Sequence, residues 1–170
     1  LVRAQTTPDP VVIPTNAVHF AVGHTETLTL ADGAKLGVFQ NAFASEADVV
    51  WETAVAPFPT IPSGYLQTGS RYHFLAIGPT TFGTASRPLA VALPVGNSLW
   101  DRSIWLYTTA TATWTKLSSS VNAAGVLINA SPKVFEGEVV VLENHALEVG
   151  IGSWYCKNHC SARYPKYHGT

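Results

Sequence analysis

The stretch TLTLADGAKLGV, residues 27–38, carries the pattern on which the fold prediction rests. Apolar and polar residues alternate on both sides of Asp32-Gly33. Alternation with a period of two is typical of a half-buried β-strand, and an Asp-Gly pair between two such runs indicates a tight hairpin. The type I′ turn that such hairpins favour needs a positive φ at both central residues. We therefore predict an antiparallel hairpin with a type I′ turn here.

The same period continues along most of the chain. Residues 49–55, 71–77, 89–93 and 103–108 alternate in this way, whereas residues 139–142 form a continuous apolar run that suits a strand buried on both faces. No segment holds a helical period over three turns, and a short helix or turn near residue 44 is the best exception. We predict roughly eight to ten strands in an all-β, immunoglobulin-like β-sandwich.

Composition divides the chain and limits its functions. At 170 residues it suits one domain with a real core. Residues 1–17 are proline-rich and predict an extended arm, residues 18–145 predict the sandwich, and residues 146–170 form a short tail that contains both cysteines. The net charge is only -1, which disfavours binding to nucleic acid. No apolar run approaches the roughly 18 residues that a membrane span needs.

Two stretches resemble the ZU-type (zonula-occludens/uncoordinated) β-sandwich, a module also met in bacterial surface proteins. Residues 27–43, TLTLADGAKLGVFQNAF, are similar to its early strand, hairpin and following strand, and residues 87–141 are similar to its closing strands. The resemblance implies an immunoglobulin-like fold and an extracellular or cell-surface location. Some relatives cleave themselves at a His-Phe-Ser turn. The comparable residues 130–135, ASPKVF, lack that arrangement, so we do not expect autoproteolysis.

The tail contains the most specific local feature, WYCKNHC at residues 154–160. In one interpretation Cys156 and Cys160 form a small-loop disulfide, as suits an exported protein. In a second, both cysteines join His159 and His168 as ligands of a metal ion, for which zinc is the natural choice. In a third, the cysteines bond to another chain. Haem is disfavoured because the Cys-x-x-Cys-His motif is absent, and we predict no other cofactor.

Catalytic constellations are hard to find in this sequence. It has no Gly-x-Ser-x-Gly elbow, phosphate loop or dinucleotide fingerprint. The pair Glu46 and Asp48 is more typical of a solvated strand edge than of a glycosidase dyad, which needs a cleft. His19 and His24 lack an obvious third ligand, so ordinary strand and loop positions are favoured over a metal site. We predict that the protein is not an enzyme.

Four aromatic residues lie within one predicted hairpin region: Trp100, Trp105, Tyr107 and Trp114. If Ile104 and Leu106 face the core, alternation turns the aromatic residues of the same strand outward. Exposed aromatic rings stack on sugars or form protein interfaces. In the competing interpretation, Trp105 belongs to the core between the two sheets. The two interpretations are equally compatible with the sequence.

Two functions of different classes follow. The first is an extracellular structural or adhesive module that assembles with copies of itself or with other surface proteins. In that case the proline-rich arm adds a strand to the open sheet edge of a neighbour. The alternative is a carbohydrate-binding module that uses the exposed tryptophans and tyrosine as a platform.

Overall fold

Eleven β-strands and no helix make up the part of the chain that the computed structural model describes, residues 11–145. The strands are β1 (Val18–Phe20), β2 (Glu26–Thr29), β3 (Lys35–Val38), β4 (Ala47–Thr53), β5 (Tyr65–Ile77), β6 (Leu89–Pro94), β7 (Arg102–Thr108), β8 (Thr113–Lys116), β9 (Ser119–Val121), β10 (Leu127–Ala130) and β11 (Glu136–Asn144). Nothing in this part could cross a membrane as a helix.

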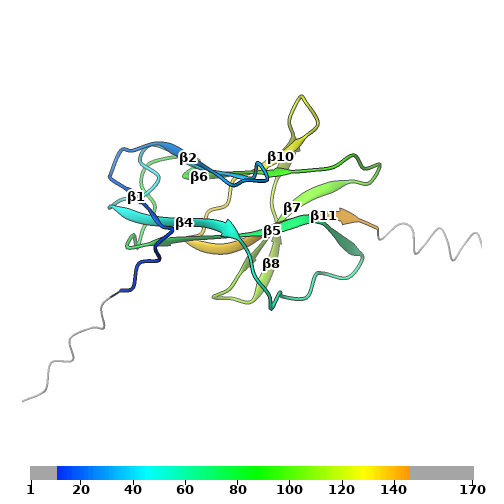
Figure 1. The fold of residues 1–170 in the computed structure, drawn as a ribbon, viewed down its shortest axis with the longest axis horizontal. Helices are drawn as coiled ribbons and strands as arrows, with labels where there is room; N and C mark the ends of the chain where they lie inside the picture. The colour runs from blue at the N-terminus through cyan, green and yellow to red at the C-terminus, as the bar shows by residue number, and fades with distance from the viewer. Residues whose placement is uncertain (1–10, 146–170) are drawn as a thin grey trace, which may run out of the picture.

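The strands form two sheets in which every neighbouring pair is antiparallel. One sheet has six strands in the order β1-β4-β5-β11-β7-β8, and the other has five in the order β2-β3-β6-β10-β9. The two sheets lie one above the other in Figure 1. The prediction of an all-β sandwich is confirmed.

The core lies between the sheets and consists of the apolar residues that the alternation indicates. In β3, Leu36 and Val38 are buried, whereas Lys35 between the turn and Leu36 is exposed. The largest fully buried side chains of this core are Phe20, Phe74, Leu36, Leu89, Leu93, Ile104, Ile128, Val49, Val91 and Val139. Each such side chain contributes about 1.5–3 kcal/mol when it leaves water, so this layer is the main source of stability.

The central strand of the six-stranded sheet is β11, between β5 and β7. Its residues 139–142 are all buried, which confirms the prediction of a strand covered on both faces. Val139 and Val141 belong to the core. Val140 points to the opposite, outer face, where it lies between Arg71 of β5 and Trp105 of β7. The outer face of this sheet is therefore covered as well.

The predicted hairpin exists between β2 and β3, but its turn type differs from the prediction. Only Gly33 has a positive φ, 89°, and Asp32 does not. The amide of Gly33 donates to the carbonyl of Leu30 at 2.9 Å, and the amide of Leu30 donates to the carbonyl of Ala34 at 2.9 Å. This is a three-residue connection with glycine in the left-handed region. The Asp32 carboxylate favours it by accepting from the Ala34 amide at 3.0 Å.

Side chains from the six-stranded sheet reach this hairpin and link the two sheets. The Tyr72 hydroxyl of β5 donates to Asp32 Oδ2 at 2.7 Å. Trp51 of β4 stacks on Tyr72 with ring centroids 5.4 Å apart, and its Nε1 donates to the Ala34 carbonyl at 3.4 Å. The hairpin that dominates the sequence pattern is thus held from the opposite sheet by two aromatic residues.

The remaining differences concern short elements. Strands β1, β8 and β9 are three or four residues long and mostly solvent-facing, so they have no apolar period to detect. Residues 39–42 form a turn, closed by the Ala42 amide donating to the Phe39 carbonyl at 3.0 Å, with Asn41 at φ 56°; no helix forms here. Gly83 packs against this turn, and its amide donates to the Ala42 carbonyl at 2.8 Å. An isolated bridge between Phe43 and Phe82 accompanies the turn.

Candidate functional site

The cysteine-bearing tail lies outside the described residues, so the disulfide and metal interpretations of Cys156, His159, Cys160 and His168 stay predictions. Within residues 11–145, no group of three or more His, Cys, Asp or Glu side chains is arranged to hold a metal ion. His19 lies beside Asp48, with Nδ1 3.0 Å from Oδ1. His24 lies beside Glu26, with Nε2 3.2 Å from Oε2. Both histidines thus have carboxylate neighbours at exposed strand and loop positions.

The aromatic residues of β7 lie on the outer face of the six-stranded sheet. Ile104 and Leu106 face the core, so Trp105 and Tyr107 point away from it. On the neighbouring strand β8, Trp114 lies opposite Tyr107, with ring centroids 5.2 Å apart. Three of the four predicted aromatic residues therefore share one face. The interpretation of Trp105 as a residue between the sheets is wrong, because strand alternation places it on the other side of β7.

These rings are half-buried rather than free. Trp105 packs edge-to-face on Tyr65, with centroids 4.8 Å apart, and its Nε1 donates to Ser103 Oγ at 3.1 Å. Trp100 packs elsewhere, against His145, with centroids 4.2 Å apart. Of the four residues of the predicted platform, Trp105, Tyr107 and Trp114 are only partly exposed, and Trp100 is not packed with them.

A segment between β4 and β5, residues 54–64, lies on this same outer face, away from the five-stranded sheet (Figure 1). The carbonyl of Thr60 accepts a hydrogen bond from Trp114 Nε1 at 2.8 Å. The carbonyl of Pro59 accepts one from Arg71 Nη1 at 3.1 Å. Two side chains of the sheet, Trp114 and Arg71, thus hold the segment by its backbone.

Arg71 is at the centre of this covered region and is only 5% exposed. Its guanidinium lies over the rings of Phe58 at 4.7 Å and Trp114 at 5.7 Å. Its Nε donates to Gln67 Oε1 at 2.7 Å, and its Nη1 lies 4.0 Å from Glu138 Oε2. Burial lowers the pKa of Arg71 from its ordinary value, and the Glu138 carboxylate opposes that shift. The Arg71 guanidinium packs on the aromatic rings and has polar partners within the protein, so this cluster contributes to packing and leaves no free charge for a ligand.

Carboxylates and histidines occupy the rest of the same face. His73 of β5 lies between strands β4 and β11, with Nδ1 3.4 Å from Glu52 Oε1 and Nε2 3.8 Å from Glu136 Oε1. His19 and Asp48 extend this acidic row to the edge strand β1. None of these side chains lines any of the three pockets described for residues 11–145.

The outer face of the five-stranded sheet is different, because the outward side chains of its central strand β6 include Ala90 and Ala92, which are small. Gly37 of β3 lies opposite Ala90 of β6. Two residues further along β6, on the same face, Ala92 lies opposite Asn129 of β10. A Cβ atom added to Gly37 would meet nothing closer than 3.7 Å. The alternation of leucine and valine with alanine in β6 is the sequence feature that indicates such a floor, although it does not reveal what surrounds it.

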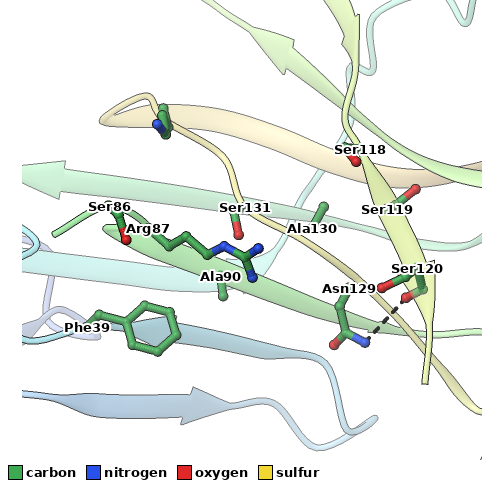
Figure 2. A pocket seen from close by; sticks show the side chains of 11 residues that line it. Phe39, Ser86, Arg87, Ala90, Ser118, Ser119, Ser120, Asn129, Ala130 and Ser131 are labelled. Carbon is green, nitrogen blue, oxygen red and sulfur yellow. Dashed lines mark hydrogen bonds between the residues drawn. The ribbon is translucent and has the colours of Figure 1, made fainter. Parts of the chain in front are cut away.

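At one end of this floor the chain forms a pocket of about 450 Å³. Its lining is Phe39, Ser86, Arg87, Ala90, Ser118, Ser119, Ser120, Asn129, Ala130, Ser131 and Lys133. Figure 2 shows the Arg87 side chain reaching over Ala90 toward Ser131, with Phe39 on one side and Asn129 on the other. The lining contains two cations, five hydroxyls, an amide and an aromatic ring, but no carboxylate.

The cations of this pocket differ from the others in their partners. Among the six Lys and Arg residues of the described chain, Arg71 and Lys116 have carboxylates within 4.0 Å, and Arg102 donates to the Gly96 carbonyl. The side chains of the other three make no ion pair or hydrogen bond with a described residue: Lys35, Arg87 and Lys133. Two of these three line the pocket. Their charges are thus available to a ligand.

Sequence reasoning missed this pocket because its residues come from separate segments. Phe39 follows β3, Arg87 precedes β6, and Lys133 follows β10. Each segment alone resembles an ordinary loop, and only the pairing of β3, β6, β10 and β9 brings them together.

No protein-family model matches this chain, and neither curated proteins nor solved structures give a match. The resemblance to the ZU-type module therefore stays a prediction.

Proposed function

We propose that this protein is a non-catalytic, extracellular assembly module that associates with copies of itself by strand addition. The observation that carries the proposal is a run of three apolar, β-branched residues at the start of the described chain. Val11, Val12 and Ile13 are 72%, 84% and 51% exposed. Such residues favour strands, and a contiguous exposed group of them is typical of an interaction site.

The sandwich also offers places where such a segment can bind. The outermost strands are β1 and β8 in one sheet and β2 and β9 in the other. Among the described residues, each pairs with a strand on one side only. An extended segment of another copy would find unpaired backbone donors and acceptors there. Backbone hydrogen bonds would supply affinity, and the valine and isoleucine side chains would add apolar contact.

An extracellular location is part of the same proposal. Its support is the composition, with 12% charged residues against roughly a quarter in average domains, together with two cysteines in the tail. Assembly modules outside the cell act by contact rather than by chemistry.

Light scattering after size-exclusion chromatography tests the proposal. The wild-type chain is expected to form oligomers, and a variant with Val11→Ser, Val12→Ser and Ile13→Ser is expected to be a monomer. Leu99→Ser is the control, because Leu99 is another exposed apolar residue, at 104%, and is distant in the sequence from residues 11–13. It should leave the oligomer intact.

Two outcomes would count against the proposal. A wild-type chain that is monomeric at every concentration, or a triple variant with the mass of the wild type, contradicts self-assembly through residues 11–13. A thermal melt of both proteins checks the fold, and the melting temperatures should agree because none of the three side chains is part of the core.

Carbohydrate binding through the aromatic face is a second candidate function. It is favoured by one observation, that Trp105, Tyr107 and Trp114 share the outer face of the six-stranded sheet. Only their rims are exposed, since residues 54–64 lie beside them. A neutral polysaccharide that binds there should shift tryptophan emission, and Trp114→Ala should abolish the shift. An unchanged spectrum with all polysaccharides tested argues against this candidate.

A further inference from the structure

The proposed assembly through residues 11–13 assigns no ligand to the pocket on the outer face of the five-stranded sheet. We infer that this pocket binds an acidic sugar residue, a pyranose ring that bears a carboxylate, with the carboxylate held by Arg87. The inference does not depend on the proposed self-assembly. It rests on the charge, the hydrogen-bonding groups and the shape of the pocket.

The charge of the pocket selects an anion. Arg87 and Lys133 have no carboxylate partner in the described chain, and no acidic side chain lines the pocket. A guanidinium offers parallel N–H donors that match both oxygens of a carboxylate. Lys133 adds a second positive charge without a fixed geometry. A carboxylate is therefore a better partner for Arg87 than a neutral group.

The neutral groups of the pocket match hydroxyls rather than apolar surface. Five serine hydroxyls line it, and a hydroxyl can both donate and accept. Ser119 Oγ already accepts from the Ile104 amide at 3.3 Å, so the other four are the main partners for a ligand. The Asn129 amide nitrogen donates to the Ser120 carbonyl at 3.4 Å, which orients the amide and leaves its Oδ1 without a partner among the described residues. A sugar ring carries several hydroxyls that need such partners. A simple carboxylic acid would leave most of these groups unused.

The volume of the pocket and the Phe39 ring at its side suit a ligand of one or two pyranose rings. The pocket volume of about 450 Å³ lies in the range of roughly 300–1,000 Å³ that is usual for small-ligand sites. Phe39 at the side of the pocket is 43% exposed, and Ala90 keeps the floor low. An apolar face of a pyranose can pack on the Phe39 ring while its hydroxyls face the serines. Phe39 thus distinguishes a sugar acid from an inorganic anion.

The test uses amide NMR spectra of the full 170-residue chain titrated with glucuronic acid. Resonances of pocket residues, such as Arg87, Ser120 and Asn129, are expected to shift with saturation. Three control ligands are titrated in the same way. Glucose has the pyranose ring without the carboxylate, acetate has the carboxylate without the ring, and inorganic phosphate is an anion of another kind. Each should bind about tenfold more weakly than glucuronic acid, since each lacks one part of the contacts.

Two variants and a matched control locate the site. Arg87→Gln should weaken glucuronic acid binding about tenfold, as expected for loss of a charged hydrogen bond. Phe39→Ala should weaken glucuronic acid binding but leave acetate binding unchanged. Lys35→Gln removes an unpaired cation from the same sheet face but outside the pocket lining, and should have no effect. The dispersion of each spectrum reports whether the variant is folded.

Several results would overturn the inference. Glucuronic acid without shifts in the pocket, equal affinity for glucose, or equal affinity for acetate or phosphate each contradicts an acidic-sugar site. An effect of Lys35→Gln as large as that of Arg87→Gln shows attraction by overall charge only, and also contradicts it. None of these results bears on the oligomeric state, so failure here is distinct from failure of the assembly proposal.

Discussion

The two outer faces of the sandwich differ in whether an arginine side chain is buried with partners or exposed without them. On the six-stranded sheet, Arg71 is buried beneath residues 54–64 and has a carboxylate, an amide and two rings as neighbours. On the five-stranded sheet, Arg87 is exposed over Ala90 and has no partner among the described residues. The comparison teaches that residue type does not identify a binding site in this fold. What identifies a binding site is whether the charged or polar side chain already has hydrogen-bonding or charged partners within the protein.

The largest expected difference between the faces is the effect of removing each arginine. Arg71→Ala should destabilise the protein by about 3 kcal/mol, because it removes the charge that faces Glu138 Oε2, a buried oxygen with no hydrogen-bond partner in the described chain. Arg87→Ala should change stability by less than about 0.5 kcal/mol. Urea unfolding of both variants measures the difference. Similar midpoints would refute the distinction between the two faces.

A smaller effect is expected from adding one methyl group to a glycine in each sheet. In Gly137→Ala, the new Cβ would lie 2.6 Å from Leu106 Cδ1 and 2.9 Å from the Tyr107 carbonyl oxygen, so a loss of about 2 kcal/mol is expected. In Gly37→Ala, the nearest atom is 3.7 Å away. Replacing this strand glycine should stabilise the protein by about 0.5 kcal/mol. Thermal melts would show opposite shifts, and a loss in both variants would mean that the floor near Gly37 is not open.

The smallest expected difference between two proteins concerns the link between the sheets. Tyr72→Phe removes the hydrogen bond to Asp32 and should cost about 1 kcal/mol at neutral pH. Burial and the Asp32 carboxylate raise the pKa of Tyr72 above its ordinary value of 10.0. The unfolded chain therefore loses this proton first, and wild-type stability should fall as the pH rises above about 10.

The variant lacks this ionisable group, so its stability should fall less over the same pH range. Urea unfolding at about pH 9 and at about pH 11 measures both slopes, provided that the other tyrosines behave alike in the two proteins. Equal slopes would show that Tyr72 titrates with its ordinary pKa in the folded state.

Alternation predicted most of the fold because a sandwich buries one face of each strand. Leu36, Val91 and Ile104 are all buried where the period of two places them. The turn at Asp32-Gly33 was predicted in place but not in type. The hydrogen bond from the Ala34 amide to the Asp32 side chain favours the longer connection, and a residue pair alone does not reveal that contact.

The site was less predictable, because it depends on contacts between distant segments. The sequence indicates that Trp105 and Tyr107 share a face, but not that residues 54–64 lie beside them, since that segment has only proline-rich loop character. Nor does it show that Arg71 is buried and Arg87 is not. Both are single arginines near predicted strands, and the difference arises from the tertiary neighbours.

Chemical labelling of arginine is the most direct test of the central claim that the two faces differ in whether their polar groups are already satisfied. Phenylglyoxal reacts with accessible guanidinium groups, and mass spectrometry of peptides from the folded protein reports the extent at each arginine. Arg87 should be modified rapidly, while Arg71, at 5% exposure, should be protected until the protein unfolds. Equal labelling of the two, or faster labelling of Arg71, would contradict the account.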